Sequence, residues 1–142
     1  MLMVAELKAE VRVLERAGGT GQSVVLDVSY DSGCDTMAIP SSDLNEMMAQ
    51  GSIETLRRVK TNTAGGKAIA YRVRLEVRVL TLDAMNVLIP WHVVSCNCYD
   101  DLSFRLFHGV LEKNCFVCNH PHRQRLYAAR TKDLLLRRMP KK

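Results

Sequence analysis

The sequence has no run of about 18 uncharged apolar residues, the length that a helix needs to cross a membrane. Nor does it open with a basic start and a long apolar core, which a secretory signal would require. Its cysteines number five, and an odd number favours reduced thiols over a disulfide framework. We therefore expect an intracellular (cytoplasmic) protein with no membrane partner.

Acidic residues are nearly absent from the C-terminal end. Residues 121–142 contain eight Lys and Arg against the single acid Asp133, whereas residues 1–120 contain 12 basic and 14 acidic residues. Tyr127 is the one aromatic residue in this tail, so base stacking is not indicated. A polyprotein linker, a solvated helix and phosphate contacts to nucleic acid are the three interpretations, and the last is the least favoured.

Alternation of apolar and charged residues gives the main structural signal. Over residues 71–80, Val73, Leu75, Val77 and Val79 alternate with charged residues, which predicts a strand with one buried face. Further strands are predicted at residues 4–16, 24–29, 56–63, 67–82, 86–94 and 104–107. Helices are predicted at residues 42–50, capped by Ser42, and at residues 131–139. The expected fold is mainly β with one or two short helices.

One segment combines a strand with a chemically suggestive turn. The β-branched run of residues 24–29 leads into Asp31-Ser32-Gly33, and the apolar run from Met37 to Ile39 follows at once. Such a turn presents a carboxylate at the end of a buried strand. The serine hydroxyl can bond locally, and the glycine lets another backbone approach closely.

Residues 24–44 resemble the retroviral-type aspartic proteases, that is, the retropepsins and retrotransposon proteases. The resemblance implies that Asp31 is the catalytic aspartate, Ser32 the hydroxyl that braces the dimer and Gly33 the close-approach glycine. Asp35 falls where family members place a substrate-contacting carboxylate. The hairpin after residue 56 corresponds to the family's flap, whose substrate-binding tip would be Thr63, Ala64, Gly65 and Gly66.

The resemblance also implies an architecture and a mechanism. It implies a retropepsin-like closed barrel over residues 1–113, followed by a basic extension that contains Cys and His over residues 114–142. The chain holds a single Asp-Ser/Thr-Gly motif. An aspartic endopeptidase needs two carboxylates that share a proton, so the expected enzyme is a homodimer that cleaves a polypeptide, with no cofactor or metal.

Two other interpretations stay open. The first is a catalytically inactive dimerisation or binding module with the same fold. The second is a small zinc- or nucleic-acid-binding protein, because Cys115, Cys118, His120 and His122 have spacings that a zinc site can use. A buried strand around Cys115 explains the same residues without a metal.

Overall fold

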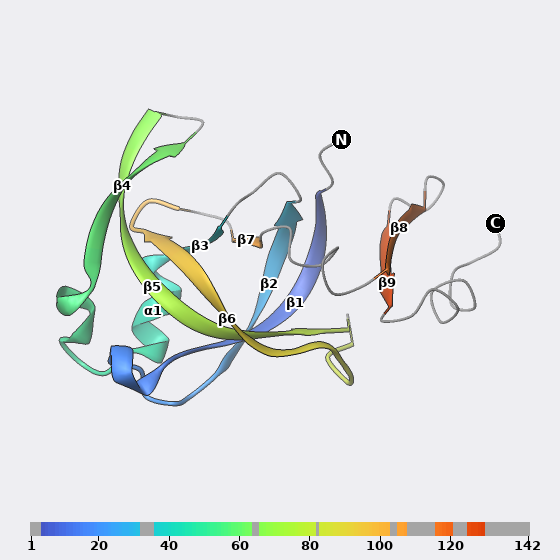
Figure 1. Cartoon of the computed structure of the whole chain (residues 1–142), viewed down its shortest axis with the longest axis horizontal. Coiled ribbons are helices and arrows are strands. Elements are labelled where there is room, and N and C mark those ends of the chain that lie inside the picture. The colour runs from blue at the N-terminus through green and yellow to red at the C-terminus, as the bar shows by residue number, and fades with distance from the viewer. Residues whose placement is uncertain are drawn as a thin grey trace.

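The computed structural model describes residues 4–31, 36–63, 66–81, 83–102, 105–107, 116–120 and 125–129. Within these residues the chain is mainly β with one short α-helix, as the sequence predicts (Figure 1). The strands are β1 (Val4–Val13), β2 (Val24–Asp31), β3 (Met37–Pro40), β4 (Arg57–Thr63), β5 (Gly66–Leu80), β6 (Val87–Tyr99), β7 (Leu106–Phe107), β8 (Phe116–His120) and β9 (Arg125–Ala129). The helices are η1 (Glu15–Ala17), α1 (Ser41–Met47) and η2 (Ser52–Thr55), of which η1 and η2 are 3-10 turns.

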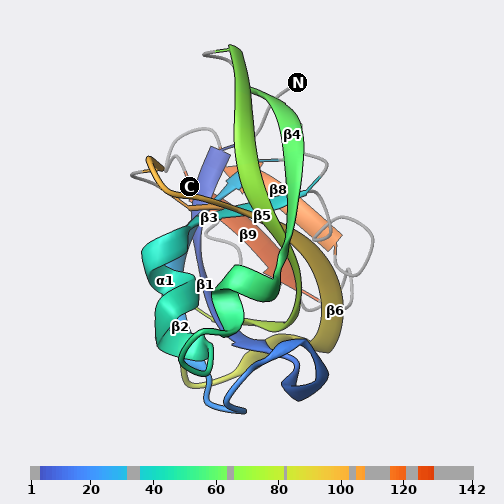
Figure 2. The same cartoon turned by 90° about the vertical axis from the view of Figure 1, so that its left-hand side faces the viewer.

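Seven strands form one sheet in the order β1-β2-β7-β3-β6-β5-β4. In addition, β1 pairs antiparallel with β5 along the edge opposite β2, from Lys8 facing Leu80 to Val13 facing Leu75. The last two strands, β8 and β9, form a separate antiparallel pair (Figure 1). The β4–β5 hairpin extends away from the other labelled elements in both Figure 1 and Figure 2.

The core forms where the inner faces of these strands meet α1. Along β5 the predicted alternation is confirmed, since Val73, Leu75, Val77 and Val79 are buried while Arg72 and Arg74 are exposed. From α1, Leu44 and Met47 are fully buried in the same core. Transfer of such apolar side chains out of water is the main stabilising contribution in a domain of this size.

The strand predicted at residues 86–94 continues to Tyr99, because its last residues pair with β3 and β5. Two other predicted ends were also wrong, and backbone hydrogen bonds explain both. The first strand ends at Val13 instead of residue 16, because Leu14 accepts backbone bonds from Ala17 and Gly19 and the chain turns into η1. The helix ends at Met47 instead of residue 50, since the Met47 carbonyl accepts a bond of 3.0 Å from the Thr20 N–H. Tertiary partners thus replace the next helical turn.

The start of the helix also differs from the prediction. Ser42 lies inside α1, and Pro40 stands at the cap position with no side-chain hydrogen bond to the helix. Proline fits at this position because its fixed φ suits the start of a helix and because it has no backbone N–H that would need an acceptor. The predicted helix at residues 131–139 lies outside the described residues.

Candidate active site

Asp31 is the last residue of β2 and is held by strands on both sides. It faces Val4 of β1 in an antiparallel pairing. On the other edge, Tyr30 faces Phe107 of β7 in a parallel pairing, and the Ser29 N–H donates to the Arg105 carbonyl at 2.8 Å. Strand pairing therefore holds the backbone of β2 up to Asp31, the candidate catalytic residue.

Strand β7 separates two strands that are consecutive in the chain. It pairs parallel with β2 and antiparallel with β3, where Ala38 faces Leu106. The connection from Asp31 to Thr36 therefore joins two strands that are not neighbours in the sheet. Ser32, Gly33 and Asp35 lie in this connection, outside the described residues.

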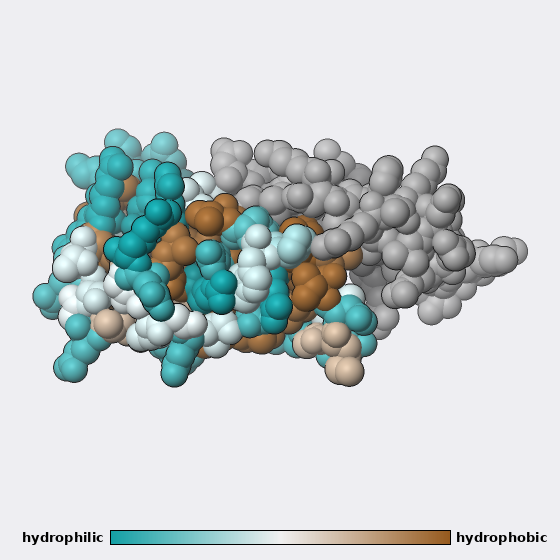
Figure 3. All heavy atoms as spheres, turned by 60° about the horizontal axis from the view of Figure 1, so that its bottom comes forward, coloured by the Kyte–Doolittle hydropathy of each residue, from teal (hydrophilic) through white to brown (hydrophobic). Residues whose placement is uncertain are grey.

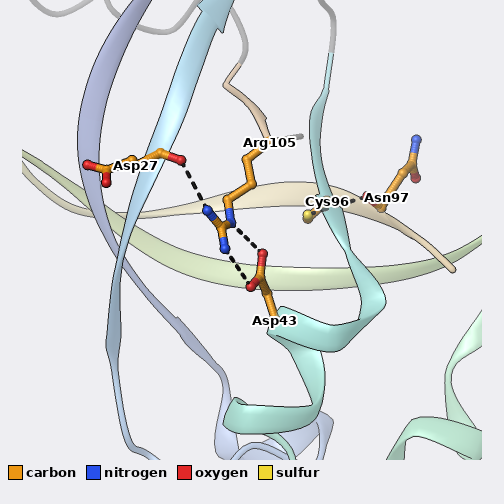
Figure 4. A network of polar contacts seen from close by, with 5 residues as sticks. All are labelled: Asp27, Asp43, Cys96, Asn97 and Arg105. Carbon is orange, nitrogen blue, oxygen red and sulfur yellow. Dashed lines mark hydrogen bonds and ion pairs between the residues drawn. The ribbon is translucent and has the colours of Figure 1, made fainter. Parts of the chain in front are cut away.

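A bidentate ion pair fixes the start of β7 to the helix. Arg105 Nε and Nη2 donate to the two carboxylate oxygens of Asp43, at 2.6 and 2.9 Å (Figure 4). Asp43 lies in the first turn of α1 and is buried. Arg105 Nη1 also reaches toward the Asp27 carbonyl at 3.5 Å, so the guanidinium lies between β2 and α1.

Two charged groups in and beside this network have shifted pKa values. The hydrogen bond to Asp43 raises the pKa of Arg105 above its usual value, against a smaller opposing effect of burial. On the outer side of β2, the hydrogen bond from Lys8 lowers the pKa of the exposed Asp27 carboxyl.

A chain of polar contacts links the β4–β5 hairpin to the segment that follows Asp31. Arg72 Nε donates to Asn97 Oδ1 at 3.2 Å, and Asn97 Nδ2 donates to Thr36 Oγ1 at 3.4 Å. The hydroxyls of Thr61 and Tyr99 share a hydrogen bond of 2.8 Å beside them. Asn97 is buried, and Arg72 lies at the exposed end of this chain.

The predicted flap residues fall at the end of this hairpin. Thr63 faces Gly66, and Thr63 Oγ1 donates to the Gly66 carbonyl at 2.8 Å. Gly66 has a φ of +114°, a backbone conformation that glycine adopts without strain. Ala64 and Gly65 lie outside the described residues.

The cysteines that the structure describes are buried and carry no sign of reactivity. Cys96 and Cys98 lie side by side on β6 as free thiols in the core. Burial raises the pKa of the Cys96 thiol well above its usual range, and the neighbouring Cys98 adds to this effect. A protonated thiol is a poor nucleophile and a poor metal ligand.

No group of three His, Cys, Asp or Glu among the described residues could hold a metal ion. Cys118 and His120 lie on β8, where only the backbone is described, and Cys115 and His122 lie outside the described residues. Within the described residues, no helix combines the length and the apolar composition needed for a membrane crossing.

Sequence patterns did not identify Asp43 and Arg105, which help to hold the strand that pairs with β2 just before Asp31. Asp43 was seen only as part of a helix start, and Arg105 carried no recognised signal. The one available hint was a single arginine inside the apolar segment Phe104 to Phe107. Its partner is 62 residues away in the chain, so no local pattern connects them.

No protein-family model, curated protein or solved structure matches this chain at a significant level.

Proposed function

We propose that this chain is an aspartic endopeptidase of the retroviral and retrotransposon type. The observation that carries the proposal is the position of Asp-Ser-Gly. It begins at the last residue of β2, at the point where β7 separates β2 from β3. Strand pairing holds the backbone that carries the Asp31 carboxylate in a fixed position, as a catalytic site requires.

The strand pairing supports the retropepsin-like barrel that this proposal includes. Because β1 pairs with both β2 and β5, the pairing returns from β5 to the first strand, as it would in a closed barrel. The β4–β5 hairpin follows β3 and α1 in the chain, where the family places its flap. In the proposed domain division the protease covers residues 1–113, and residues 114–142 form the basic extension.

The proposed chemistry requires two copies of the chain. Asp31 from each protomer would contribute one carboxylate, about 3 Å from the other across a two-fold axis. Two like charges so close cannot both ionise, so the dyad holds one proton and titrates as a pair. The ionised carboxylate takes a proton from water, and the protonated one donates to the substrate carbonyl.

The neighbouring residues take the roles that the resemblance implies. Ser32 braces the dimer at the active site, and Gly33 lets the backbones approach. Asp35 contacts the substrate on one side, and the hairpin tip from Thr63 to Gly66 covers it on the other. The extended substrate then adds main-chain hydrogen bonds to the protein.

The test compares the wild type with Asp31→Asn on a mixture of unstructured peptides at acidic pH. We expect the wild type to form new peptide termini and to be inhibited by a statine-type transition-state analogue. We expect Asp31→Asn to lose at least about 1,000-fold in rate while remaining folded and dimeric. Asp27→Asn, on the same strand but exposed, is the matched control and should keep full activity. Cleavage by Asp31→Asn would refute the proposal.

The rival interpretation predicts a different pattern in the same experiment. A catalytically inactive module with this fold would form a dimer, and neither the wild type nor the variant would cleave any peptide. Sedimentation of the wild type, measured beside the cleavage assay, separates this outcome from a protein that fails to dimerise.

A further inference from the structure

The basic residues of the body are concentrated in one hairpin. Residues 57–75 contain no Asp or Glu, while residues 1–56 and 76–120 together contain six basic and 14 acidic residues. All six basic side chains of the hairpin are exposed: Arg57, Arg58, Lys60, Lys67, Arg72 and Arg74. On the face in Figure 3, hydrophilic residues dominate the end of the molecule at which β4 and β5 lie in Figure 1.

Among the side chains that the structure describes, these six lack acidic partners, as does Arg16, whereas the other basic residues have them. Elsewhere in the described residues, Lys8, Arg12, Arg78 and Arg105 each form an ion pair with a carboxylate. None of the six hairpin side chains is in an ion pair within the part of the chain that the structure describes. Their positive charge is therefore available to an external anion.

The strand register places three of the six side chains on each face of the hairpin, and Arg57, Arg72 and Arg74 share one of these faces. Arg57 lies directly opposite Arg72, and Arg74 follows on the same face two residues later. Like charges in facing positions of an antiparallel pair destabilise the pairing. An anionic group held between them would remove that repulsion, so the arrangement favours a ligand with negative charges.

The edge of β4 indicates which kind of anionic ligand fits. Among the described strands β4 pairs only with β5, so its other edge has free main-chain donors and acceptors. An extended polypeptide can add to such an edge by backbone hydrogen bonds, whereas a nucleic acid cannot. The combination of a free edge and unpaired guanidinium groups fits an acidic peptide.

We propose that the β4–β5 hairpin binds an extended acidic polypeptide segment, and that the substrate of the proposed protease is therefore rich in Asp and Glu near the cleaved bond. The second part depends on the proposed function. The contacts from Arg72 through Asn97 to Thr36 connect this basic face to the segment that carries the Asp-Ser-Gly motif.

Binding is measured first in the Asp31→Asn background, in which the proposed cleavage is blocked. The probes are a fluorescent peptide in which Glu alternates with Val and a matched peptide with Gln in place of Glu, both at neutral pH. We expect only the Glu peptide to bind, and its affinity should fall as salt rises to about 0.15 M. Equal binding of the two peptides would overturn the proposal.

The hairpin is then neutralised by Arg57→Gln with Arg72→Gln. We expect the Kd of the Glu peptide to rise about five- to tenfold, because two exposed charge contacts are lost. The matched control is Arg137→Gln with Arg138→Gln, which removes the same charge from the tail and should leave the Kd within about twofold. An equal loss in the tail variant would contradict the proposal, as would an oligonucleotide that binds the hairpin more tightly than the Glu peptide.

The thermal unfolding of the hairpin variant and the cleavage of the two peptides are measured separately. The hairpin variant should unfold at the same temperature as its parent or higher, since it loses a repulsion. If it unfolds earlier, Arg74→Gln alone serves as the test, with the same direction expected. If the wild type cleaves the Glu and Gln peptides at equal rates, the substrate inference fails while the protease proposal stands. If the Glu peptide binds but is never cleaved, the protease proposal fails while the binding site stands.

Discussion

At the residue scale, a single ion pair helps to hold β7 in position. Arg105 precedes β7 directly, and its guanidinium makes two hydrogen bonds to the buried Asp43 carboxylate. Since β7 pairs with β2 just before Asp31, this ion pair helps to hold the backbone on which the candidate catalytic residue stands. Bidentate pairs of this kind provide geometric specificity as well as energy.

Replacement of Asp43 by Asn should destabilise the protein. The change leaves the Arg105 charge without its partner in a partly buried place, which we expect to cost roughly 2 kcal/mol of unfolding free energy. Urea unfolding at neutral pH measures this change. Amide exchange at Ser29, whose N–H bonds to the Arg105 carbonyl, should also become faster.

The control for this prediction is Asp27→Asn. Asp27 pairs with Lys8 at 2.8 Å, but its side chain is 71% exposed. Exposed pairs contribute little, so we expect a change within about 0.5 kcal/mol. Equal destabilisation by the two variants would show that Arg105 and Asp43 have no special role.

At the element scale, side chains join the β4–β5 hairpin to β6 at two levels, with Arg72 and Asn97 in contact near its base and Thr61 and Tyr99 closer to its tip. The shared hydrogen bond between the Thr61 and Tyr99 hydroxyls is the shortest of these contacts. The part of the hairpin beyond it contacts little else, as its exposed side chains indicate. A hairpin end held by so few contacts can open locally without unfolding the core.

Tyr99→Phe should therefore loosen the hairpin more than the protein. We expect a loss of about 1 kcal/mol or less in global stability. Amide exchange in β4 should become clearly faster, with no change in β1 and β2. The matched control is Tyr71→Phe, because the Tyr71 hydroxyl only accepts from the exposed Arg58 at 3.1 Å. Equal acceleration in the two variants would contradict a specific role for the Thr61–Tyr99 contact.

The sequence predicted the elements much better than their assembly. Alternation along β5 identified that strand because Val73 to Val79 pack into a core on one face only. The strand at residues 125–129 was missed, since Leu126 to Ala129 show no clear alternation and, among the described strands, β9 pairs only with β8. The insertion of β7 between β2 and β3 could not be predicted from the sequence. A strand of two residues is too short to show a pattern, and pairing with strands that are distant in the chain sets its place in the sheet.

The residues of the candidate site could be predicted from the sequence only in part. Asp31 could be singled out because the motif and its flanking strands are contiguous in the chain. Asp43, Asn97 and Arg105 could not, since each acts through a partner that is distant in sequence. Local patterns indicate where a reactive group stands, whereas its support comes from contacts that only the folded chain creates.

At the scale of the whole molecule, Glu10 connects three parts of the sheet. Its carboxylate accepts from Arg78 on β5 at 2.8 Å and from Ser23, just before β2, at 2.6 Å, while its own backbone belongs to β1. Burial acts to raise the pKa of Glu10, but the hydrogen bonds from Ser23 and Arg78 and the charges of Arg78 and Arg12 outweigh it, so the pKa lies below its ordinary value of 4.5. The ionised form is thus favoured by folding.

The lowered pKa of Glu10 determines how its contribution to stability depends on pH. A carboxyl whose pKa is lowered in the folded state stabilises the protein above the unfolded pKa, and this contribution is lost as pH falls through the folded pKa. We expect the contribution of Glu10 to be complete at neutral pH and to decline only below about 4.5.

Glu10→Gln tests this expectation when unfolding is measured from neutral pH down to about pH 3. The variant should be about 1 kcal/mol less stable than the wild type at neutral pH, and the difference should shrink towards zero as the wild-type carboxyl takes up its proton. Glu54→Gln is the control, at an exposed position with no ion pair within the described residues, and it should follow the wild type at every pH. A constant difference between Glu10→Gln and the wild type across the range would mean that Glu10 acts through packing alone, and the link between its charge and the integrity of the sheet would be lost.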